Sequence, residues 1–278
     1  MNMFAPRKAQ PHKPRIISIA NQKGGVGKTT TAINLGTGLA AVGARVLIID
    51  LDPQGNASTG FGIPRSERAV STYELIIDEA PLETAFMPTK IPNLSIVPST
   101  VDLSGAELEL INVVRRSFRL RDCFTKYFQS PPPGAPIFDY ILIDCPPSLN
   151  LLTVNAMTAS DAVLVPLQCE FFALEGLSQL LKTIDLVKDS LNPELEIQGV
   201  VLTMYDRRNN LSDQVAKDVR EYLGEKVYKT VIPRNVRVSE APSHGKPALV
   251  YDHRCAGSQA YMRLARELIQ REKELLAA

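Results

Sequence analysis

The sequence is poor in cysteine, in net charge and in long apolar stretches. Its four cysteines have no CxxC spacing, no signal-peptide-like run stands at the N-terminus, and no apolar run reaches the about 18 residues of a membrane span. We therefore expect no disulfide or zinc framework, a reduced cytoplasmic setting and no membrane attachment. The formal net charge is only +1, so an anionic partner would have to meet a local cluster of arginines and lysines.

Two patterns alternate along most of the chain. Short β-branched runs that are apolar throughout are typical of strands buried on both faces, and the stretches between them have helical periodicity. This alternation predicts the α/β fold class, as a doubly wound, mainly parallel sheet with helices on both faces. The expected strands are 15–20, 45–50, 94–97, 139–144, 162–167, 197–204 and 227–232, and the expected helices are 29–42, 103–128, 150–159, 173–189, 211–223 and 256–276.

Residues 1–14 differ in character from the rest of the chain. They contain three prolines, several basic residues and no periodicity, which predicts a disordered arm. Such an arm is too short for a DNA-reading helix-turn-helix. Residues 15–278 are expected to form a single domain, although the length alone would also permit two.

The stretch ANQKGGVGKTTT at 20–31 predicts a phosphate-binding loop. Gly27, Lys28 and Thr29 match the end of the pattern GxxxxGK[ST], whereas Gln22 occupies the place of the first glycine. An expected strand precedes the loop and an expected helix comes after it, as in P-loop NTPases. The alternative is a glycine-rich turn that binds nothing.

The residue types of this loop suit the phosphates of a nucleotide. Glycines let backbone N–H groups turn toward phosphate oxygens, and the N-terminus of the next helix adds partial positive charge. Lys28 can reach the β and γ phosphates, and the Thr29 hydroxyl can bind Mg²⁺. The nucleotide-binding residues expected in the loop are Gly24, Gly25, Val26, Gly27, Lys28, Thr29 and Thr30.

Carboxylates stand at the ends of two other expected strands. Asp144 ends DYILID, where a Walker-B-type carboxylate holds Mg²⁺, commonly through water, although an Asp at a strand end can also just form a turn. Asp50 ends RVLIID, and Asp52 points the same way because the two stand two apart in an extended segment. Asp52 is the residue predicted to orient or activate the attacking water. The alternative for Asp50 is a purely structural role.

The base is predicted to be adenine. GTPases of this layout usually carry an Asn-Lys-x-Asp segment after a late strand. The corresponding segment here, TMYD at 203–206, lacks the lysine. ATP with Mg²⁺ is therefore the expected ligand.

Six stretches together resemble the ParA/Soj family of chromosome-partitioning ATPases, within the wider deviant Walker A family that includes MinD. KGGVGKTT alone indicates only the wider family, whereas TMYDRRNN and IPRNVRVSEAPSHGKP narrow the resemblance to the chromosomal type. The stretches are KGGVGKTT at 23–30, DLDPQGN at 50–56, LIDCPPSL at 142–149, PLQCEFFALEGL at 166–177, LTMYDRRNNLSDQV at 202–215 and IPRNVRVSEAPSHGKP at 232–247.

The resemblance implies a homodimer that forms when ATP is bound, with two nucleotides sandwiched at its interface. In that family the first lysine of the loop reaches the partner's phosphates, and Lys23 matches it; the alternative is a solvated loop lysine. Lys23, Lys28 and Asp52 would then be the catalytic residues. The segments around Met204, Pro233 and Arg234 would flank the adenine.

The family also binds DNA nonspecifically as ATP dimers. Arg208 and Arg237 match the positions that the family uses for DNA contact. A charge cluster can equally be a solvated surface. Weaker additions are Arg207, Arg234 and Lys246, and a second cluster, which we assign to a solvated helix face, comprises Arg115, Arg116, Arg119 and Arg121. The implied protein partner is a ParB-type centromere-binding protein that stimulates hydrolysis on nucleoid DNA.

Three other functions are alternatives to partitioning. A MinD-like membrane-associated division-site ATPase would use a C-terminal amphipathic helix, but an apolar stripe in 256–276 is also typical of a helix packed on its own sheet. An electron carrier of the nitrogenase iron-protein type needs paired cysteines, whereas those here suit small buried positions. A sequence-specific repressor needs a DNA-reading domain. The stripe residues are Tyr261, Leu264, Ala265, Leu268 and Ile269, and the cysteines are Cys123, Cys145, Cys169 and Cys255.

Overall fold

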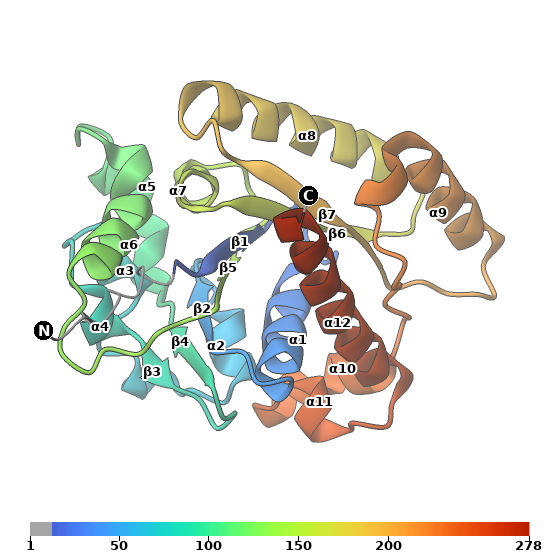
Figure 1. Cartoon of the computed structure of the whole chain (residues 1–278), viewed down its shortest axis with the longest axis horizontal. Coiled ribbons are helices and arrows are strands. Elements are labelled where there is room, and N and C mark those ends of the chain that lie inside the picture. Colours follow the sequence, from blue (N-terminus) through green and yellow to red (C-terminus); the bar gives the residue numbers. More distant parts are fainter. Residues whose placement is uncertain (1–12, 278) are drawn as a thin grey trace, which may run out of the picture.

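A seven-stranded sheet runs through the part of the chain that the computed structural model describes, residues 13–277 (Figure 1). Its order is β3-β4-β2-β5-β1-β6-β7, and every neighbouring pair is parallel except β3 with β4. The predicted α/β fold class is confirmed. The strands are β1 (Arg15–Ile19), β2 (Val46–Asp50), β3 (Met87–Pro88), β4 (Leu94–Val97), β5 (Tyr140–Asp144), β6 (Ala162–Gln168) and β7 (Glu196–Thr203). Of the predicted N-terminal arm, residues 1–12 lie outside the described residues.

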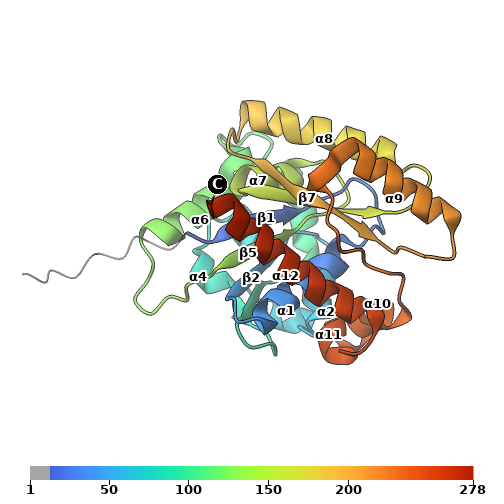
Figure 2. The ribbon, with the colours of Figure 1, turned by 45° about the vertical axis from the view of Figure 1, so that its right-hand side comes forward.

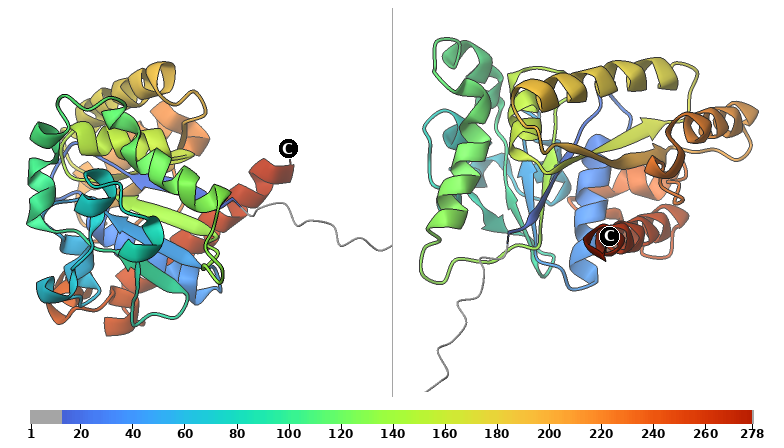
Figure 3. Two further views of the ribbon diagram at one scale, coloured as in Figure 1. Left: turned by 90° about the vertical axis from the view of Figure 1, so that its left-hand side faces the viewer. Right: turned by 45° about the horizontal axis from the view of Figure 1, so that its top comes forward.

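Helices cover both faces of the sheet, as predicted. Successive strand residues alternate between two apolar clusters, one beneath α6, α7 and α8 and one beneath α1 and α12. Figures 2 and 3 show α1 and α12 side by side on the second face. The helices are α1 (Lys28–Ala41), α2 (Asn56–Gly60), α3 (Thr72–Ile76), α4 (Leu82–Ala85), α5 (Ala106–Glu109), α6 (Arg119–Gln129), α7 (Leu151–Ala159), α8 (Ala173–Ser190), α9 (Asn210–Leu223), α10 (Val236–Glu240), α11 (Ala248–Tyr251) and α12 (Ala256–Ala277).

Side-chain caps fix where several helices begin. The Asn150 carboxamide accepts a hydrogen bond from the backbone N–H of Thr153 at the start of α7. Asn235 does the same for Val238 in α10. Such caps satisfy N–H groups that have no partner in the first helical turn.

Two predicted elements differ from the structure. The predicted helix 103–128 is interrupted, because Arg115 adopts a left-handed backbone with φ of +62° between α5 and α6. The predicted strand 227–232 forms only an isolated bridge to β7. The N–H groups of Lys229 and Thr230 donate instead to the carboxylate of Glu267 on α12, at 2.7 and 2.8 Å. The N–H groups of Tyr228 and Ile232 still donate to β7 carbonyls, at 2.9 and 2.8 Å, so the segment stays beside β7 without forming a regular strand.

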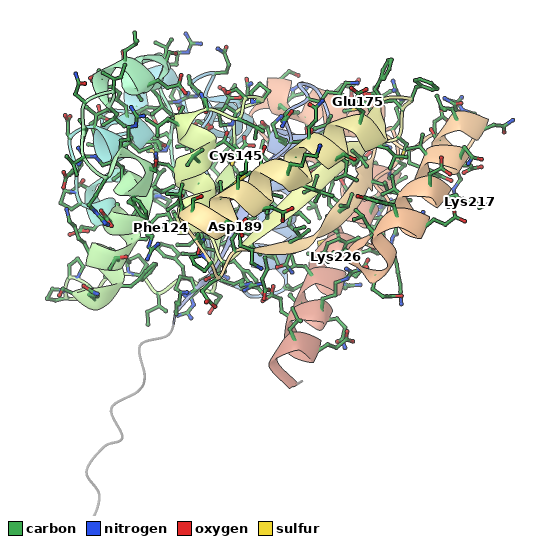
Figure 4. All side chains as sticks on the ribbon, turned by 90° about the horizontal axis from the view of Figure 1, so that it is seen from above. Phe124, Cys145, Glu175, Asp189, Lys217 and Lys226 are labelled. Carbon is green, nitrogen blue, oxygen red and sulfur yellow. The ribbon has the colours of Figure 1, made fainter. Side chains whose placement is uncertain are left out.

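The parallel strands bring the candidate residues to one edge of the sheet. Asp144 pairs in register with Ile19 on one side and Asp50 on the other. The phosphate loop starts directly after Ile19, so it faces both carboxylates. Figure 4 shows α8 from above, with Glu175 near its start and Asp189 near its end, and Cys145, the residue after Asp144, in the middle of the molecule.

Candidate nucleotide and magnesium site

The loop between β1 and α1 is held in one conformation by its glycines and by β7. Gly25 and Gly27 have φ of +76° and +90°, a region that glycine occupies without strain. The Thr203 hydroxyl at the end of β7 donates to the carbonyl of Val26 at 2.8 Å. Lys28 starts α1, and no acidic residue stands in the first turn of that helix. Phosphate would therefore meet free N–H groups and the positive end of the helix dipole.

Lys28 is placed inside the site. Its side chain is buried, and its Nζ donates to the carbonyl of Lys23 at 2.9 Å. Burial lowers the pKa of Lys28, while the carboxylates of Asp144 and Asp52 raise it. The ammonium group thus lies close to both acidic segments.

Asp144 is a buried carboxyl without a hydrogen-bond partner. It is inaccessible to solvent, and neither of its oxygens accepts a hydrogen bond of good geometry from the described residues. Burial raises its pKa well above the usual range and the neighbouring Asp50 raises it further, whereas the adjacent Thr29 hydroxyl lowers it. A buried carboxyl group beside a hydroxyl fits an oxygen-rich Mg²⁺ site.

Asp50 has one structural oxygen and one free oxygen. Its Oδ2 accepts from the N–H and the hydroxyl of Ser58 in α2, at 2.8 and 2.6 Å. Its buried Oδ1 has no partner among the described residues. Burial raises the pKa of Asp50 to about 6, and Asp52 adds to the rise, while the Ser58 hydrogen bonds oppose it. The bonds to Ser58 support the structural role considered for Asp50.

Asp52 sits in a tight turn at the mouth of the site. Its Oδ1 accepts from the N–H of Gln54 at 3.0 Å, and its carbonyl accepts from the N–H of Gly55 at 2.8 Å. The side chain is largely buried. Local hydrogen bonds within this turn, rather than the extended strand, therefore set the direction of the Asp52 carboxylate.

Lys23 pairs with an acidic residue of another segment. Its side chain is 47% exposed, and its Nζ forms an ion pair with the carboxylate of Glu170, just after β6. Gly24 is exposed, and a Cβ there would meet no atom of the chain within 4 Å. Glu170 was not singled out from the sequence, because no local pattern marks a contact between such distant segments.

The three residues expected near adenine come together at the end of β7. Met204 has φ of +50°. Arg234 donates its N–H to the carbonyl of Tyr205 at 3.0 Å, and Tyr205 forms an isolated bridge with Pro233. Met204 and Arg234 line one cavity of about 450 Å³, together with residues of the β6 end and of the start of α9. This arrangement could hold a base through backbone atoms.

The two arginines predicted to contact DNA are exposed and each has an acidic neighbour. Arg208, 88% exposed, donates to both oxygens of Asp206 at 3.0 and 2.8 Å. Arg237 pairs with Glu240 at 3.1 Å. A surface cavity near the end of β7 is lined by Arg207, Arg208, Arg234 and Arg263. Arg263 was not predicted from the sequence, because it lies on α12, far along the chain from the other three arginines.

The second arginine cluster is paired locally. Arg115 pairs with Asp122 at 2.8 Å, and Arg119 pairs with Glu79. Arg115 is exposed, as expected for a solvated face, whereas the side chain of Arg119 is only 15% exposed and therefore departs from that expectation.

The structure also bears on the membrane-associated and electron-carrier alternatives. The apolar stripe of α12 faces α1, and Tyr261, Leu264, Ala265 and Leu268 are buried there. No helix among the described residues is long and apolar enough to span a bilayer. As predicted, Cys123, Cys145 and Cys169 are buried, whereas Cys255 is half-buried and near Ser258.

Known proteins share this sequence and fold. A family model described as AAA domain matches residues 14–197. The chromosome partitioning protein ParA of Caulobacter vibrioides is 65% identical over 94% of this chain and 96% of its own. The sporulation initiation inhibitor protein Soj of Bacillus subtilis is 52% identical over 91% and 98%.

A solved structure extends the comparison to a bound state. It is cobyrinic acid a,c-diamide synthase from Mycobacterium smegmatis with a bound ATP analogue and magnesium. That chain is 34% identical, superposes with a TM-score of 0.80, and covers 94% of this chain and 96% of its own. The sheet order and the loop described above thus belong to a fold known to hold nucleotide and magnesium.

Proposed function

This chain belongs to the ParA/Soj family of chromosome-partitioning P-loop proteins, and on that premise we propose that it is an ATP-driven switch for DNA segregation. In this proposal the ATP-bound form is a dimer that binds DNA without sequence preference. Hydrolysis of ATP to ADP and phosphate then releases it from the nucleoid. The cargo proposed is the chromosomal origin.

The observation that carries the ATPase proposal is the buried, unpartnered Asp144 beside the phosphate loop. Thr29 and Asp144 would hold Mg²⁺ together with phosphate oxygens and water. When bound, Mg²⁺ neutralises charge on the β and γ phosphates. Lys28 would leave the Lys23 carbonyl for the phosphates, and the loop N–H groups would bind their oxygens.

Asp52 is proposed to orient the attacking water. Its turn fixes the carboxylate, and its charge lies close enough to Lys28 to raise the pKa of that lysine. Positioning and charge stabilisation supply most of the catalysis in phosphoryl transfer. A carboxylate of this kind has to accept a hydrogen bond from water rather than remove a proton completely.

Lys23 is proposed to act on the nucleotide of the second subunit. ATP carries about four negative charges, of which Mg²⁺ offsets two, so a further cation beyond Lys28 is favourable. The Lys23 side chain is 47% exposed, so it is accessible to a second subunit. A cation supplied by the partner makes dimerisation depend on ATP.

DNA contact is assigned to Arg208 and Arg237. In a dimer each arginine occurs twice on one surface, which offsets the near neutrality of the chain. Both arginines form exposed ion pairs with their acidic neighbours. Exchanging such a neighbour for a DNA phosphate costs little free energy. A ParB-type partner that stimulates hydrolysis completes the proposed cycle.

The test is DNA binding by the full chain with ATP, with ADP and without nucleotide. Asp52→Ala should hold the unhydrolysed state, so it should bind DNA with ATP at least as strongly as the wild type and release it slowly. Asp144→Asn is a matched control that should lose magnesium-dependent ATP binding and with it DNA binding. Binding that is equal in all three nucleotide conditions would contradict the switch.

A further inference from the structure

Arg68 is a buried arginine whose position the sequence did not single out. It comes directly after the 3₁₀ turn Arg65–Glu67, and only 6% of its surface is exposed. No carboxylate of the described residues lies within ion-pair distance of its guanidinium group. Its donors go to the carbonyls of Ile63 (2.8 Å), Ser99 (2.9 Å) and Gly55 (3.4 Å) and to the hydroxyl of Thr59 (3.0 Å).

These acceptors lie on two segments that meet at the site. Gly55, Thr59 and Ile63 belong to the stretch after Asp52, and Ser99 lies two residues after β4 ends. One planar group therefore ties the Asp52 segment to the carboxyl edge of the sheet. A lysine cannot replace it, because an ammonium group lacks the fixed fork of donors that reaches several acceptors.

Gly55 is a second indication that this segment accommodates the guanidinium group of Arg68. Its φ is +63°, and a Cβ there would lie 2.3 Å from Nη1 of Arg68 and 3.0 Å from the carbonyl oxygen of Ser99. Any side chain would displace the guanidinium group. The glycine of DPQGN is thus required both by its backbone angle and by Arg68.

Hydrogen bonds connect two of the acceptors of Arg68 to the acidic residues Asp52 and Asp50. Gly55 donates its N–H to the carbonyl of Asp52 at 2.8 Å, which closes the turn. Ser99 donates its N–H to the Ser58 hydroxyl at 3.1 Å, and that hydroxyl donates to Asp50 at 2.6 Å. Arg68 is the link between these two chains of hydrogen bonds.

We propose that Arg68 is a positioning residue for ATP hydrolysis, which fixes the turn that presents Asp52 to the attacking water. The inference rests on the proposed ATPase function. In this proposal Arg68 acts through Gly55, whose carbonyl accepts its hydrogen bond, rather than on the nucleotide itself. Burying a guanidinium group is unfavourable unless its donors are satisfied, and here they are satisfied by the backbone that Asp52 depends on.

The experiment compares Arg68→Ala and Arg68→Lys with Arg65→Ala, an exposed arginine of the same segment. ATP affinity and the rate of hydrolysis are measured separately, with Mg²⁺ and DNA present. We expect kcat of both Arg68 variants to fall about 10- to 100-fold while ATP affinity changes less than about 3-fold. Arg65→Ala should match the wild type. Millimolar guanidinium should restore part of the rate of Arg68→Ala.

Three outcomes decide between this role and its alternatives. An unchanged kcat in a folded Arg68 variant would overturn the proposal, and so would a parallel fall of kcat and ATP affinity without guanidinium rescue. If Arg68→Ala does not fold, Arg68→Lys carries the test, with Gly55→Ala expected to lower kcat in the same way. Absence of hydrolysis in the wild type would instead contradict the ATPase function itself.

Discussion

Lys23 and Glu170 form an ion pair within one chain although 147 residues separate them in the sequence. Both side chains are partly exposed, and exposed pairs contribute only about 0–1 kcal/mol. In the proposed dimer, Lys23 would therefore exchange Glu170 for a phosphate of the second subunit at little cost in free energy. Glu170 would then be the partner of this lysine in the monomer.

Lys23→Ala should reduce ATP-dependent dimerisation and hydrolysis while leaving the folding of the monomer unchanged, because the side chain is exposed. Light scattering with ATP measures the dimer, and thermal unfolding measures the fold. Glu170→Gln, which removes the ion pair but keeps the lysine, is the matched variant and should still dimerise. An undiminished dimer in Lys23→Ala would remove the role proposed for this lysine.

Gly24→Val should fold and fail to dimerise. A Cβ at this position meets nothing within 4 Å in the chain, so the monomer has room for a side chain. Two loops that approach each other across an interface do not have that room. The dimer is measured as for Lys23, with Gly24→Ala expected to be intermediate. Normal dimerisation of the valine variant would place the interface elsewhere.

Arg208→Glu and Arg237→Glu should weaken DNA binding equally on all sequences. The logarithm of the binding constant falls with the logarithm of salt concentration by about 0.9 per phosphate contact. Each replacement should therefore flatten this slope and leave ATP affinity unchanged. Arg115→Glu, an equal change of charge in the other cluster, serves as the control. A slope that stays the same in the Arg208 and Arg237 variants would exclude them from the contact.

Asp50→Asn should stabilise the protein without nucleotide, and more so at higher pH. The raised pKa, about 6 against an ordinary 3.8, means that the folded protein favours the protonated carboxyl. The destabilising contribution of Asp50 is therefore absent at low pH, grows between these two values and is complete above pH 6. Urea unfolding at about pH 7.5 should show Asp50→Asn more stable by about 1–3 kcal/mol. A difference that does not shrink toward about pH 4.5 would contradict this assignment.

Much of the fold could be predicted because its causes are local. Runs such as VLIID at Val46–Asp50 are buried on both faces, and no polar position interrupts them. The phosphate loop was recognisable because its geometry demands glycine at Gly25 and Gly27. Asp50 and Asp144 were recognised from the sequence as strand ends, and the structure shows that their strands are neighbours with these two residues in register.

The features that escaped prediction depend on contacts between distant segments. The strand expected at 227–232 is interrupted where Glu267 accepts the N–H groups of Lys229 and Thr230, while Tyr228 and Ile232 still bond to β7. The break near Arg115 occurs without a glycine or proline beside it. Arg68 lies in an irregular stretch, and only its acceptors in the folded chain distinguish it from the exposed Arg65.

The hydrogen bond from Thr203 to Val26 also connects two of the proposed sites. It joins the last strand of the sheet to the backbone of the phosphate loop, and Arg208 follows Thr203 in the next few residues of the chain. If Arg208 binds DNA as proposed, segment 203–208 would link the DNA contact to the loop that would hold the nucleotide.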